Sequence, residues 1–400
     1  MDNFVIVGAG QAGRRAAEAL RERAPDARIS IVGEESHLPY DRPSLSKDAL
    51  FDEQHERNAF VRDANYYDSQ RIDMRLGVCA MSINRQEKTL RLDDGSQITY
   101  DRLLLSTGSR VRRLEGSAVH YLRTLDDARA LRARLVPEAE VVIIGGGFIG
   151  LEVAATAVSR GCRVTLMEPA DRLLKRSMPA VVSAFMRVLH THHGLDLRLG
   201  AQVERVQQRN DGRVVVDTSS GPVLADLVVA GIGVVPNTEL AESAGLEVAD
   251  GIVVDEYCRT SDADIFAAGE VTQHFIPRLG RHVRVESWQV AEKQPAIAAA
   301  NMLGGSERYG EIPWLWSDQY DCNVQSLGFF EPAYTIVHRG NIAAGSFAVL
   351  GLDPQGHLKS AVTVNSGRDM AALKRLVEAG SLDVQQLADP SVSLRSLIPR

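Results

Sequence analysis

Two glycine-rich turns constrain this chain more than any other feature of its sequence. Each follows a run of apolar, mostly β-branched residues and opens an alanine-rich segment: VIVGAGQAG begins at Val5 and VVIIGGGFIG at Val141. The two copies lie 137 residues apart, counted from Gly8 to Gly145. A G-x-G-x-x-G turn between a strand and a helix is typical of a site that holds the pyrophosphate of a dinucleotide. The duplication therefore predicts two such sites in one chain.

The three glycines of each copy have separate tasks. The first allows the tight turn, the second lets the backbone approach a pyrophosphate, and the third lets the helix pack against the strand. They are Gly8, Gly10 and Gly13 in the first copy and Gly145, Gly147 and Gly150 in the second. We expect helices at 11–23 and 148–159 and the next parallel strands at 28–32 and 163–167.

An acid closes the second strand of each unit, at the distance where a carboxylate accepts hydrogen bonds from an adenosine ribose. These acids are Glu34 and Glu168. Glu168 favours NADH over NADPH, because it would repel a 2′-phosphate, although Arg172 lies close enough in sequence to keep NADPH open. Two sites suggest one tightly held flavin dinucleotide and one exchanging nicotinamide dinucleotide, with hydride passing from the second to the first.

The length of 400 residues predicts two or three domains. Short strands are expected at 213–218 and 224–229. The segment from about 311 changes character and reads as a third domain, with strands near 335–337 and 347–350 and a helix near 369–379. A net charge of -7 gives no support to nucleic-acid binding, and no apolar run is long enough to span a membrane. We expect a cytoplasmic protein.

The cysteines and the clustered histidines predict no metal site. Cys79, in a strand-like run, and the three other cysteines are scattered without a C-x-x-C pair, so they form neither a disulfide framework nor a zinc site. His190, His192 and His193 lie together, but no further ligands follow them. A structural role is expected for these histidines.

Several further motifs resemble one family. The chain is similar to the FAD- and NADH-dependent ferredoxin reductases of bacterial Rieske dioxygenase and cytochrome P450 systems, over essentially its whole length. Within this family it looks most like the reductases of systems that act on anthranilate or a related aromatic acid. The motifs are LPYDRPSLSK, LLLSTGS, LRTLDDA, IGGGFIGLEVAA, AGIGVVPN, IFAAGEV, RVESWQVAEKQ and PWLWSDQ.

The resemblance implies an α/β fold of the glutathione-reductase type, with two Rossmann-like domains of βαβ units and parallel sheets plus a C-terminal α+β domain. The FAD-binding domain would comprise 1–112 and 238–308, the NADH-binding domain 113–237, and the C-terminal reductase domain 309–400. Electrons would pass from NADH through FAD to a [2Fe-2S] ferredoxin and on to a terminal Rieske oxygenase. Neither nucleic acid nor a membrane would be a partner.

The resemblance also implies site residues. Lys47 would lie near flavin N5 and Glu152 beside the flavin ring, where the two could pair as the catalytic residues. Glu270 replaces the aspartate that the family usually has, so its longer side chain must reach the ribityl chain differently. The FAD contacts would be Gly8, Gly10, Ala12, Gly13, Glu34, Arg42, Lys47, Ala80, Thr107, Gly108, Arg123, Glu270 and Trp288. The NADH contacts would be Gly145, Gly147, Phe148, Ile149, Gly150, Glu152, Glu168, Ile232, Gly233 and Trp316.

The alternatives are a rubredoxin reductase or NADH oxidase of the same fold, or a flavoprotein whose redox state controls signalling. A disulfide reductase would need a cysteine pair near Lys47, and 45–49 contains none. Because the chain is itself acidic, docking of an acidic ferredoxin would need a local basic patch. Its candidates are Arg278, Arg281, Arg284 and Arg308, with Trp314 or Trp316 as the apolar centre.

Overall fold

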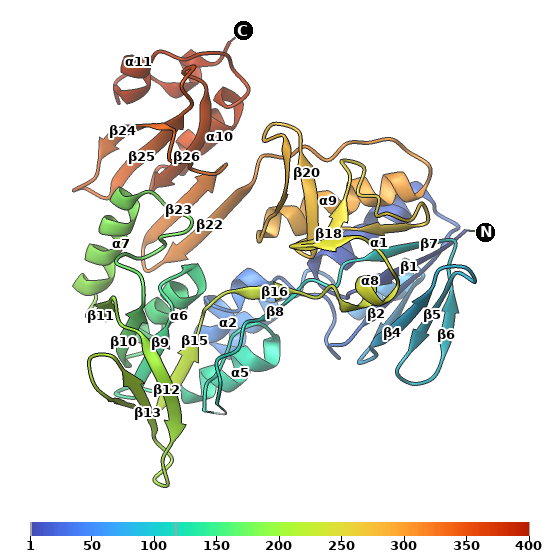
Figure 1. Ribbon diagram of the computed structural model, residues 1–400, viewed down its shortest axis with the longest axis horizontal. Helices are drawn as coiled ribbons and strands as arrows, with labels where there is room; N and C mark the ends of the chain where they lie inside the picture. Colours follow the sequence, from blue (N-terminus) through green and yellow to red (C-terminus); the bar gives the residue numbers. More distant parts are fainter. Residues whose placement is uncertain (1, 117, 400) are drawn as a thin grey trace. The chain divides into compact units, whose positions relative to one another are not determined.

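The structure, a computed structural model, describes residues 2–116 and 118–399. It contains two units, each assembled from three segments of the chain. Unit 1 consists of Met1–Pro43, Glu56–Arg110 and Val234–Pro313, and unit 2 consists of Ser44–His55, Val111–Gly233 and Trp314–Arg400. Figure 1 labels many of the helices and strands of both units.

Unit 1 is organised around a five-stranded parallel sheet with the order β19-β7-β1-β2-β3. In the central strand, Val5 pairs with Ser30 on one side and Leu103 on the other. Residues 4–7 are at most 6% exposed, as is typical of parallel strands covered on both faces. The strands are β1 (Asn3–Val7), β2 (Arg28–Gly33), β3 (Ile72–Leu76), β7 (Arg102–Leu105) and β19 (Ile265–Ala267).

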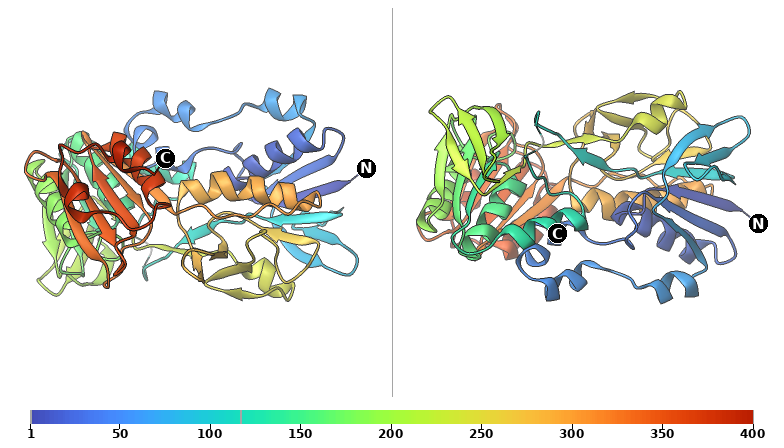
Figure 2. Two further views of the ribbon diagram at one scale, coloured as in Figure 1. Left: turned by 90° about the horizontal axis from the view of Figure 1, so that it is seen from above. Right: turned by 90° about the horizontal axis from the view of Figure 1, so that it is seen from below.

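Two helices of unit 1 pack against each other, α1 (Gln11–Arg23) and α9 (Trp288–Met302) (Figure 2). The expected first helix at 11–23 is confirmed. The buried Arg14 guanidinium of α1 lies 2.8 Å from Glu18 and 3.1 Å from Glu292 of α9, so the contact joins the helices by charge as well as by packing. Within the described chain, no helix has both the length and the apolar character that a membrane crossing requires.

Smaller elements complete unit 1. A three-stranded antiparallel sheet follows the order β4-β5-β6, and a four-stranded mixed sheet follows β17-β18-β20-β21. Cys79 precedes β4 and is not in a strand, which corrects the expectation from its sequence. The elements are α4 (Ala64–Ser69), β4 (Ala80–Asn84), β5 (Thr89–Leu92), β6 (Gln97–Thr99), α8 (Glu239–Ser243), β17 (Val248–Ala249), β18 (Gly251–Val254), β20 (Thr272–Ile276) and β21 (Arg281–Arg284).

Unit 2 contains a second parallel sheet, with the order β11-β10-β9-β15. The expected helix at 148–159 is confirmed as α6, and the strand expected at 163–167 is β10. The elements are α5 (Leu125–Arg134), β9 (Glu140–Ile144), α6 (Phe148–Ser159), β10 (Arg163–Glu168), α7 (Ala180–His192), β11 (Asp196–Leu199) and β15 (Leu227–Ala230). Short helices α2 (Asp48–Phe51) and α3 (Glu53–Glu56) lie in the preceding segment, and β8 (Ser109–Val111) pairs with β16 (Val234–Pro236).

The single strand expected at 224–229 is wrong, because the chain changes sheets at Asp226. Before it, β14 (Val223–Ala225) closes an antiparallel sheet with β13 (Val214–Thr218) and β12 (Val203–Gln208). After it, β15 joins the parallel sheet beside β9. The Asp226 carboxylate accepts a hydrogen bond from the backbone N–H of Glu140 at 2.8 Å, which fixes the point of the switch.

The C-terminal segment of unit 2 forms an antiparallel five-stranded sheet with the order β22-β23-β26-β25-β24. The strands expected near 335–337 and 347–350 are confirmed within β24 and β25. The helix near 369–379 is α10, which ends earlier, at Leu376, where the chain tightens into a turn. The elements are β22 (Trp314–Gln319), β23 (Cys322–Leu327), β24 (Thr335–Asn341), β25 (Ser346–Leu352), β26 (Leu358–Val364), α10 (Gly367–Leu376) and α11 (Val384–Ala388).

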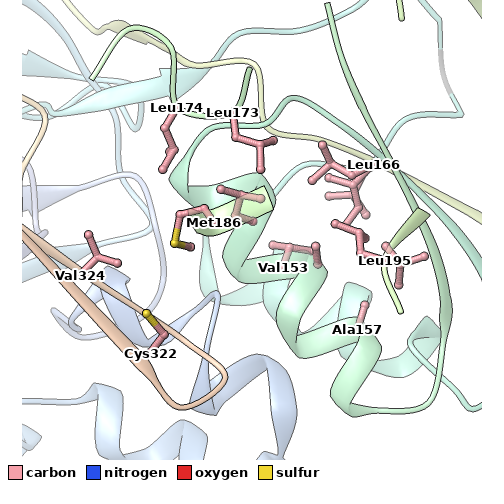
Figure 3. Close-up of a cluster of buried hydrophobic side chains, with 14 of the residues drawn as sticks. Val153, Ala157, Leu166, Leu173, Leu174, Met186, Leu195, Cys322 and Val324 are labelled. Carbon is pink, nitrogen blue, oxygen red and sulfur yellow. The ribbon is translucent and has the colours of Figure 1, made fainter. Parts of the chain in front are cut away.

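One hydrophobic core joins the second parallel sheet and the C-terminal sheet of unit 2 (Figure 3). Val153 of α6, Leu166 of β10 and Met186 of α7 belong to the same buried cluster as Cys322 and Val324 of β23. All five are at most 3% exposed. The C-terminal sheet therefore shares its apolar interior with the second parallel sheet, and the expected division into three domains stays a prediction.

The start of α5 provides a stability prediction. Thr124 and Asp127 form a reciprocal capping box, in which the Thr124 hydroxyl accepts from Asp127 N–H at 3.1 Å and the Asp127 carboxylate accepts from Thr124 N–H at 2.9 Å. Thr124→Ala should lower the free energy of unfolding by about 1 kcal/mol. Urea denaturation followed by circular dichroism measures the change.

Thr191→Ala is the matched control within a helix. The Thr191 hydroxyl bonds back to the carbonyl of Arg187, so its loss should change the free energy of unfolding by less than about 0.5 kcal/mol. Equal effects of the two substitutions would contradict the role of the capping box.

Candidate functional site

The first glycine turn connects β1 to α1 through a backbone that only glycine adopts readily. Gly8 has φ +114°, and a Cβ placed on it would lie 2.1 Å from the carbonyl oxygen of Ser106. A Cβ on Gly13 would lie 1.9 Å from the carbonyl oxygen of Gly8, so strand and helix approach at backbone distance. Two of the three predicted glycines are therefore required by packing alone.

The second turn, between β9 and α6, repeats this geometry. Gly145 has φ +109°, and its Cβ would lie 2.5 Å from the carbonyl oxygen of Gly231. A Cβ on Gly150 would lie 2.0 Å from the carbonyl oxygen of Gly145. The two turns are the same device built twice, once in each unit.

The middle glycine of each turn faces open space. A Cβ on Gly10 or on Gly147 would meet nothing within 4 Å, and both residues have extended backbones as the N-caps of α1 and α6. Neither helix has a side-chain cap or an acid in its first turn. Free N–H groups and the positive end of the helix dipole therefore meet an unfilled approach, which fits a pyrophosphate. Both turns fit a dinucleotide on this ground.

The predicted adenosine contacts of the first turn lie together in unit 1. Glu34 is exposed at the end of β2, and the strand register there continues with Val78 N–H donating to the carbonyl of Gly33. This bond brings the segment before Ala80 beside Glu34. The pKa of Cys79, in this segment, is raised by burial and by the nearby charges of Glu34 and Asp93.

Arg42 is held by an acid that the sequence did not single out. Its Nη2 donates to the Glu35 carboxylate at 2.6 Å, and the Tyr40 hydroxyl donates to the same carboxylate at 2.5 Å. Burial alone would lower the pKa of Arg42, but the charges of Tyr40, Glu35 and Glu270 outweigh it. The net effect raises the pKa, so the guanidinium stays charged. The electrostatic contact also places Glu270 in the neighbourhood of Arg42.

Glu270 follows a glycine that packs on α1. The Cβ of Gly269 would lie 3.0 Å from that of Ala12, so Glu270 emerges beside the first turn. Gly269 N–H donates to the side-chain amide oxygen of Gln294, Oε1, at 2.8 Å, which ties this loop to α9. Glu270 itself is half-buried, and its role as an FAD contact stays a prediction.

The remaining predicted FAD residues of unit 1 are fixed by specific bonds. The Thr107 hydroxyl donates to the carbonyl of Asn237 at 2.7 Å, and Asn237 N–H donates to the carbonyl of Gly108 at 2.9 Å. Trp288, the first residue of α9, donates its indole N–H to Asp41 at 3.1 Å. Asp41 was not predicted, although it lies inside the YDRP motif.

The second turn is completed by Glu168 at the end of β10. Its carboxylate accepts from Gly146 N–H at 2.6 Å and from Ala170 N–H at 2.8 Å, one bond on each oxygen. Each oxygen keeps lone-pair capacity for a ribose hydroxyl. Glu168 is therefore oriented before any nucleotide binds.

Arg172 is tied back into its own loop. Its Nη1 donates to the carbonyl of Met178 at 2.8 Å and to the Ser183 hydroxyl at 2.7 Å, and its Nη2 donates to the carbonyl of Lys175 at 3.1 Å. Ser183 is 2% exposed and donates to the carbonyl of Leu173 at 2.6 Å. Arg172, the residue that left NADPH possible as the nucleotide in the sequence analysis, is therefore engaged by protein acceptors.

Apolar residues adjoin the second turn. Ile232 approaches the turn, because its Cγ2 would lie 3.5 Å from a Cβ on Gly145, and Gly233 follows with φ +98°. Phe148 and Ile149 begin α6, and Ile149 is 47% exposed. An exposed isoleucine beside an uncapped helix start suits a flat, apolar ring.

Lys47 and Glu152 form the ion pair that the sequence suggested. Lys47 Nζ lies 3.1 Å from Glu152 Oε1, and the Glu152 side chain is only 5% exposed. The same carboxylate accepts from the Ser46 hydroxyl and, at 2.5 Å, from the Ser317 hydroxyl. Neither serine was predicted, although both lie in quoted motifs, LPYDRPSLSK and PWLWSDQ. Three donors therefore satisfy this buried carboxylate.

Two predicted cofactor residues lie elsewhere in unit 2. Arg123 precedes α5, where its N–H donates to Asp127. Trp316 of β22 stacks on Trp314, with ring centroids 5.1 Å apart. Their assignments to FAD and to NADH stay predictions.

Because a Cβ on Gly10 or Gly147 would meet no protein atom, alanine at either position should affect nucleotide binding without disturbing the fold. Gly10→Ala should leave the melting temperature of the flavin-free protein nearly unchanged but sharply lower the flavin content of the purified protein, because the methyl group occupies the phosphate approach. Gly147→Ala should leave the flavin content unchanged and weaken NADH binding. Flavin absorbance and NADH titration measure the two effects.

Gly8→Ala serves as the comparison, because its Cβ would overlap the Ser106 backbone. This variant should lose stability as well as flavin. Retention of FAD by Gly10→Ala together with unweakened NADH binding by Gly147→Ala would contradict the placement of the two nucleotides.

Comparison with known proteins agrees with this geometry. Residues 2–295 match the family described as pyridine nucleotide-disulphide oxidoreductase, and residues 314–398 match the one described as reductase C-terminal. The chain is 55% identical over 403 residues to the anthranilate 1,2-dioxygenase system ferredoxin–NAD(+) reductase component of Burkholderia cepacia, covering 99% of each chain. It is 40% identical to the p-cumate 2,3-dioxygenase system ferredoxin–NAD(+) reductase component of Pseudomonas putida, covering 99% of this chain and 98% of that one.

Two solved structures share the fold over the whole chain. The covalent putidaredoxin reductase–putidaredoxin complex has a TM-score of 0.95 at 37% identity, covering 99% of this chain and 98% of that one. The ferredoxin reductase for the CYP199A2 system from Rhodopseudomonas palustris has a TM-score of 0.95 at 36% identity, covering 100% of both chains. The expected α/β fold is confirmed. The chain belongs to the pyridine nucleotide-disulphide oxidoreductase family, as an oxidoreductase whose cofactors are FAD and NADH.

Proposed function

We propose that this protein is a ferredoxin–NAD(+) reductase that supplies electrons to an aromatic-ring-hydroxylating dioxygenase. The observation that carries the proposal is similarity along the full length of the chain, C-terminal segment included, to relatives named for this activity. The 55% identity to a component of an anthranilate system favours anthranilate or a related aromatic acid as the substrate of the terminal Rieske oxygenase. The electron acceptor would be a [2Fe-2S] ferredoxin in the cytoplasm.

The reaction balances with one NADH and two ferredoxins. NADH loses a hydride, which carries two electrons and one proton, and becomes NAD⁺. Two ferredoxins each gain one electron, and one proton returns to solvent. When bound, FAD supplies the conversion between a two-electron donor and one-electron acceptors.

The residues of the chain would bind, orient and exclude water. The uncapped starts of α1 and α6 would hold the two pyrophosphates, and Glu168 would select the unphosphorylated ribose. Ile149 and Trp316 would form apolar walls for the nicotinamide. The Lys47–Glu152 pair would present a fixed N–H donor to the flavin edge. Hydride transfer needs such alignment and a dry site more than a separate acid or base.

The domain division that accompanies this proposal is the one expected from the resemblance. The FAD-binding domain would comprise 1–112 and 238–308, the NADH-binding domain 113–237, and the C-terminal reductase domain 309–400. The shared core of unit 2 means that the last two would not unfold independently.

The cysteines favour an external electron acceptor over a disulfide. Three of the four are buried, and burial raises the pKa of each of those thiols, to about 12 for Cys322. Cys79 is half-buried and its pKa is also raised by burial. None of these thiols is poised as a nucleophile.

The specificity of the second turn predicts a preference for NADH over NADPH of at least about tenfold in kcat/KM, equivalent to about 1.4 kcal/mol. The cause is repulsion of a 2′-phosphate by Glu168, with Arg172 held away by Ser183. Steady-state kinetics with both nucleotides measures the ratio. Glu168→Gln should narrow it, because the charge is removed while one amide oxygen can still accept. Equal kcat/KM values in the parent would show that a base rescues the phosphate.

The proposed partner predicts a salt-sensitive second half-reaction. Arg284 is already paired with Asp250 at 3.0 Å and Glu286 at 2.7 Å, and Arg308 lies 3.7 Å from Glu256. These pairs reduce the net positive charge that the sequence suggested at Arg284 and Arg308. Arg281 is exposed on β21, and its charge reversal tests the patch. Arg281→Glu should raise the KM for ferredoxin and leave the KM for NADH unchanged.

Rising salt should slow ferredoxin reduction while barely changing the bleaching of the flavin by NADH, since the Debye length is about 10 Å at 0.1 M. Arg163→Glu is the control, an exposed arginine on β10 of unit 2. A salt-independent ferredoxin rate, or equal KM values for both variants, would contradict docking by the basic patch. Fast NADH consumption by oxygen alone, without ferredoxin dependence, would instead support an oxidase.

A further inference from the structure

A chain of buried hydrogen bonds extends from Glu152 through the C-terminal sheet to α7. Ser317 of β22 donates to Glu152 Oε1 at 2.5 Å and accepts from Gln319 Nε2 at 2.9 Å. Gln319 Oε1 lies 2.7 Å from His190 Nε2. Ser317, Gln319 and His190 are at most 1% exposed, and no predicted role was given to the first two.

The hydrogen bonds of this chain all donate in the same direction, from His190 toward Glu152. Because Gln319 Oε1 can only accept, His190 must carry its proton on Nε2 when neutral. Burial, with a smaller contribution from His193 and against the opposing bond to Gln319, lowers the pKa of His190 to about 4, so the ring is neutral at pH 7. Nδ1 is then the acceptor that faces the Tyr320 hydroxyl at 3.5 Å. Every proton in the chain points toward the Glu152 carboxylate.

Tyr320 anchors the outer end of these hydrogen bonds, at the cost of an unfavourable backbone conformation. Tyr320 forms the turn between β22 and β23 with φ +56°, a conformation that large side chains rarely adopt. Its ring stacks on His193, with centroids 3.7 Å apart, and meets His190 edge-on at 5.2 Å. The hairpin is thus clamped to the end of α7 by the two histidines that sequence reasoning had left without a function.

We propose that Ser317, Gln319 and His190 are positioning residues that hold the Glu152 carboxylate, and through it Lys47, in the orientation used for hydride transfer. The inference rests on the proposed function in one respect, the place of Lys47 and Glu152 beside the flavin. The three residues form a positioning chain and not a proton route, because the Gln319 amide accepts at one end and donates at the other without passing a proton on. The C-terminal sheet would thereby contribute to the reaction as well as to the core.

Two substitutions interrupt the chain at different links. Ser317→Ala removes the donor to Glu152 and leaves the Gln319–His190 bond intact. Gln319→Met keeps the side-chain size but removes both of its hydrogen bonds. Ser360→Ala is the matched control, a serine of the same sheet that is 0% exposed and whose hydroxyl has no partner among the described residues.

Two measurements on the flavin-loaded protein test the proposal, and neither requires ferredoxin. Stopped-flow bleaching of the flavin by NADH should slow about tenfold in Ser317→Ala and in Gln319→Met, the size of effect expected when a bond to a charged group is lost, with the Kd for NADH changed less than about twofold. Histidine-selective ¹⁵N NMR should show His190 protonated on Nε2 in the parent and in Ser317→Ala. This preference should be lost in Gln319→Met.

The outcomes separate the inference from the proposed function. Bleaching rates in both chain variants within about twofold of Ser360→Ala, or a parent His190 protonated on Nδ1, would overturn the positioning chain. If Gln319→Met does not fold, Ser317→Ala decides alone, since its NMR signal certifies an intact Gln319–His190 bond. Failure of the parent to reduce ferredoxin would count against the proposed function and would leave these two measurements unaffected.

Discussion

Both units depend on the same close approach of backbone to backbone. In each glycine turn the carbonyl of the first glycine occupies the space where a Cβ of the third would lie, at 1.9 Å in one and 2.0 Å in the other. This contact sets the distance between the parallel strand and its helix. It also aims the helix start at open space instead of at a side-chain cap. The unsatisfied N–H groups that would be a defect in an ordinary helix are then available to an anion.

A second constraint organises unit 2, namely the buried charge of Glu152. A carboxylate removed from water is stable only when it is paired and fully hydrogen-bonded. The three donors come from two distant parts of the chain: Ser46 and Lys47 from the N-terminal segment, and Ser317 from the C-terminal sheet. The segment Ser44–His55 therefore belongs to unit 2 by charge as well as by packing, with Leu50 buried in the shared core.

Local signals allowed part of this structure to be predicted from the sequence. The helices at 11–23 and 148–159 agree with the structure at both ends, because a glycine turn fixes the start and the apolar period fixes the extent. The Lys47–Glu152 pair was also anticipated, but from family resemblance and not from any spacing in the chain. Its serine donors were missed, because a single serine 106 or 165 residues away gives no periodic or local signal.

Other differences have equally specific causes. The strand expected at 224–229 was divided at Asp226, where the chain passes from one sheet to the next and the carboxylate accepts a hydrogen bond from the backbone N–H of Glu140 in β9. Arg172 was considered for a 2′-phosphate because it lies close to Glu168 in the sequence. That closeness does not reveal which other groups Arg172 binds. Two carbonyls of its own loop and the Ser183 hydroxyl of α7 accept its hydrogen bonds. In both cases a polar side chain found partners within the protein, which residue type and spacing do not reveal.

The two turns have the same backbone geometry. The difference between their nucleotides must therefore come from what surrounds Glu34 and Glu168. Glu168 is oriented by two backbone N–H groups and stands over a turn where Gly146 leaves room for it, since a Cβ there would lie 3.1 Å from the carboxylate. Glu34 is instead exposed at a strand end, beside the segment before Ala80. A carboxylate that is ordered in advance costs little entropy when a nucleotide arrives, so Glu168 can select the ribose without rearrangement of its loop. Exposed Glu34 would be ordered by the nucleotide itself, whereas Arg42 and Thr107, the further predicted contacts of unit 1, are already held by protein partners. Many contacts made at once suit a cofactor that stays bound.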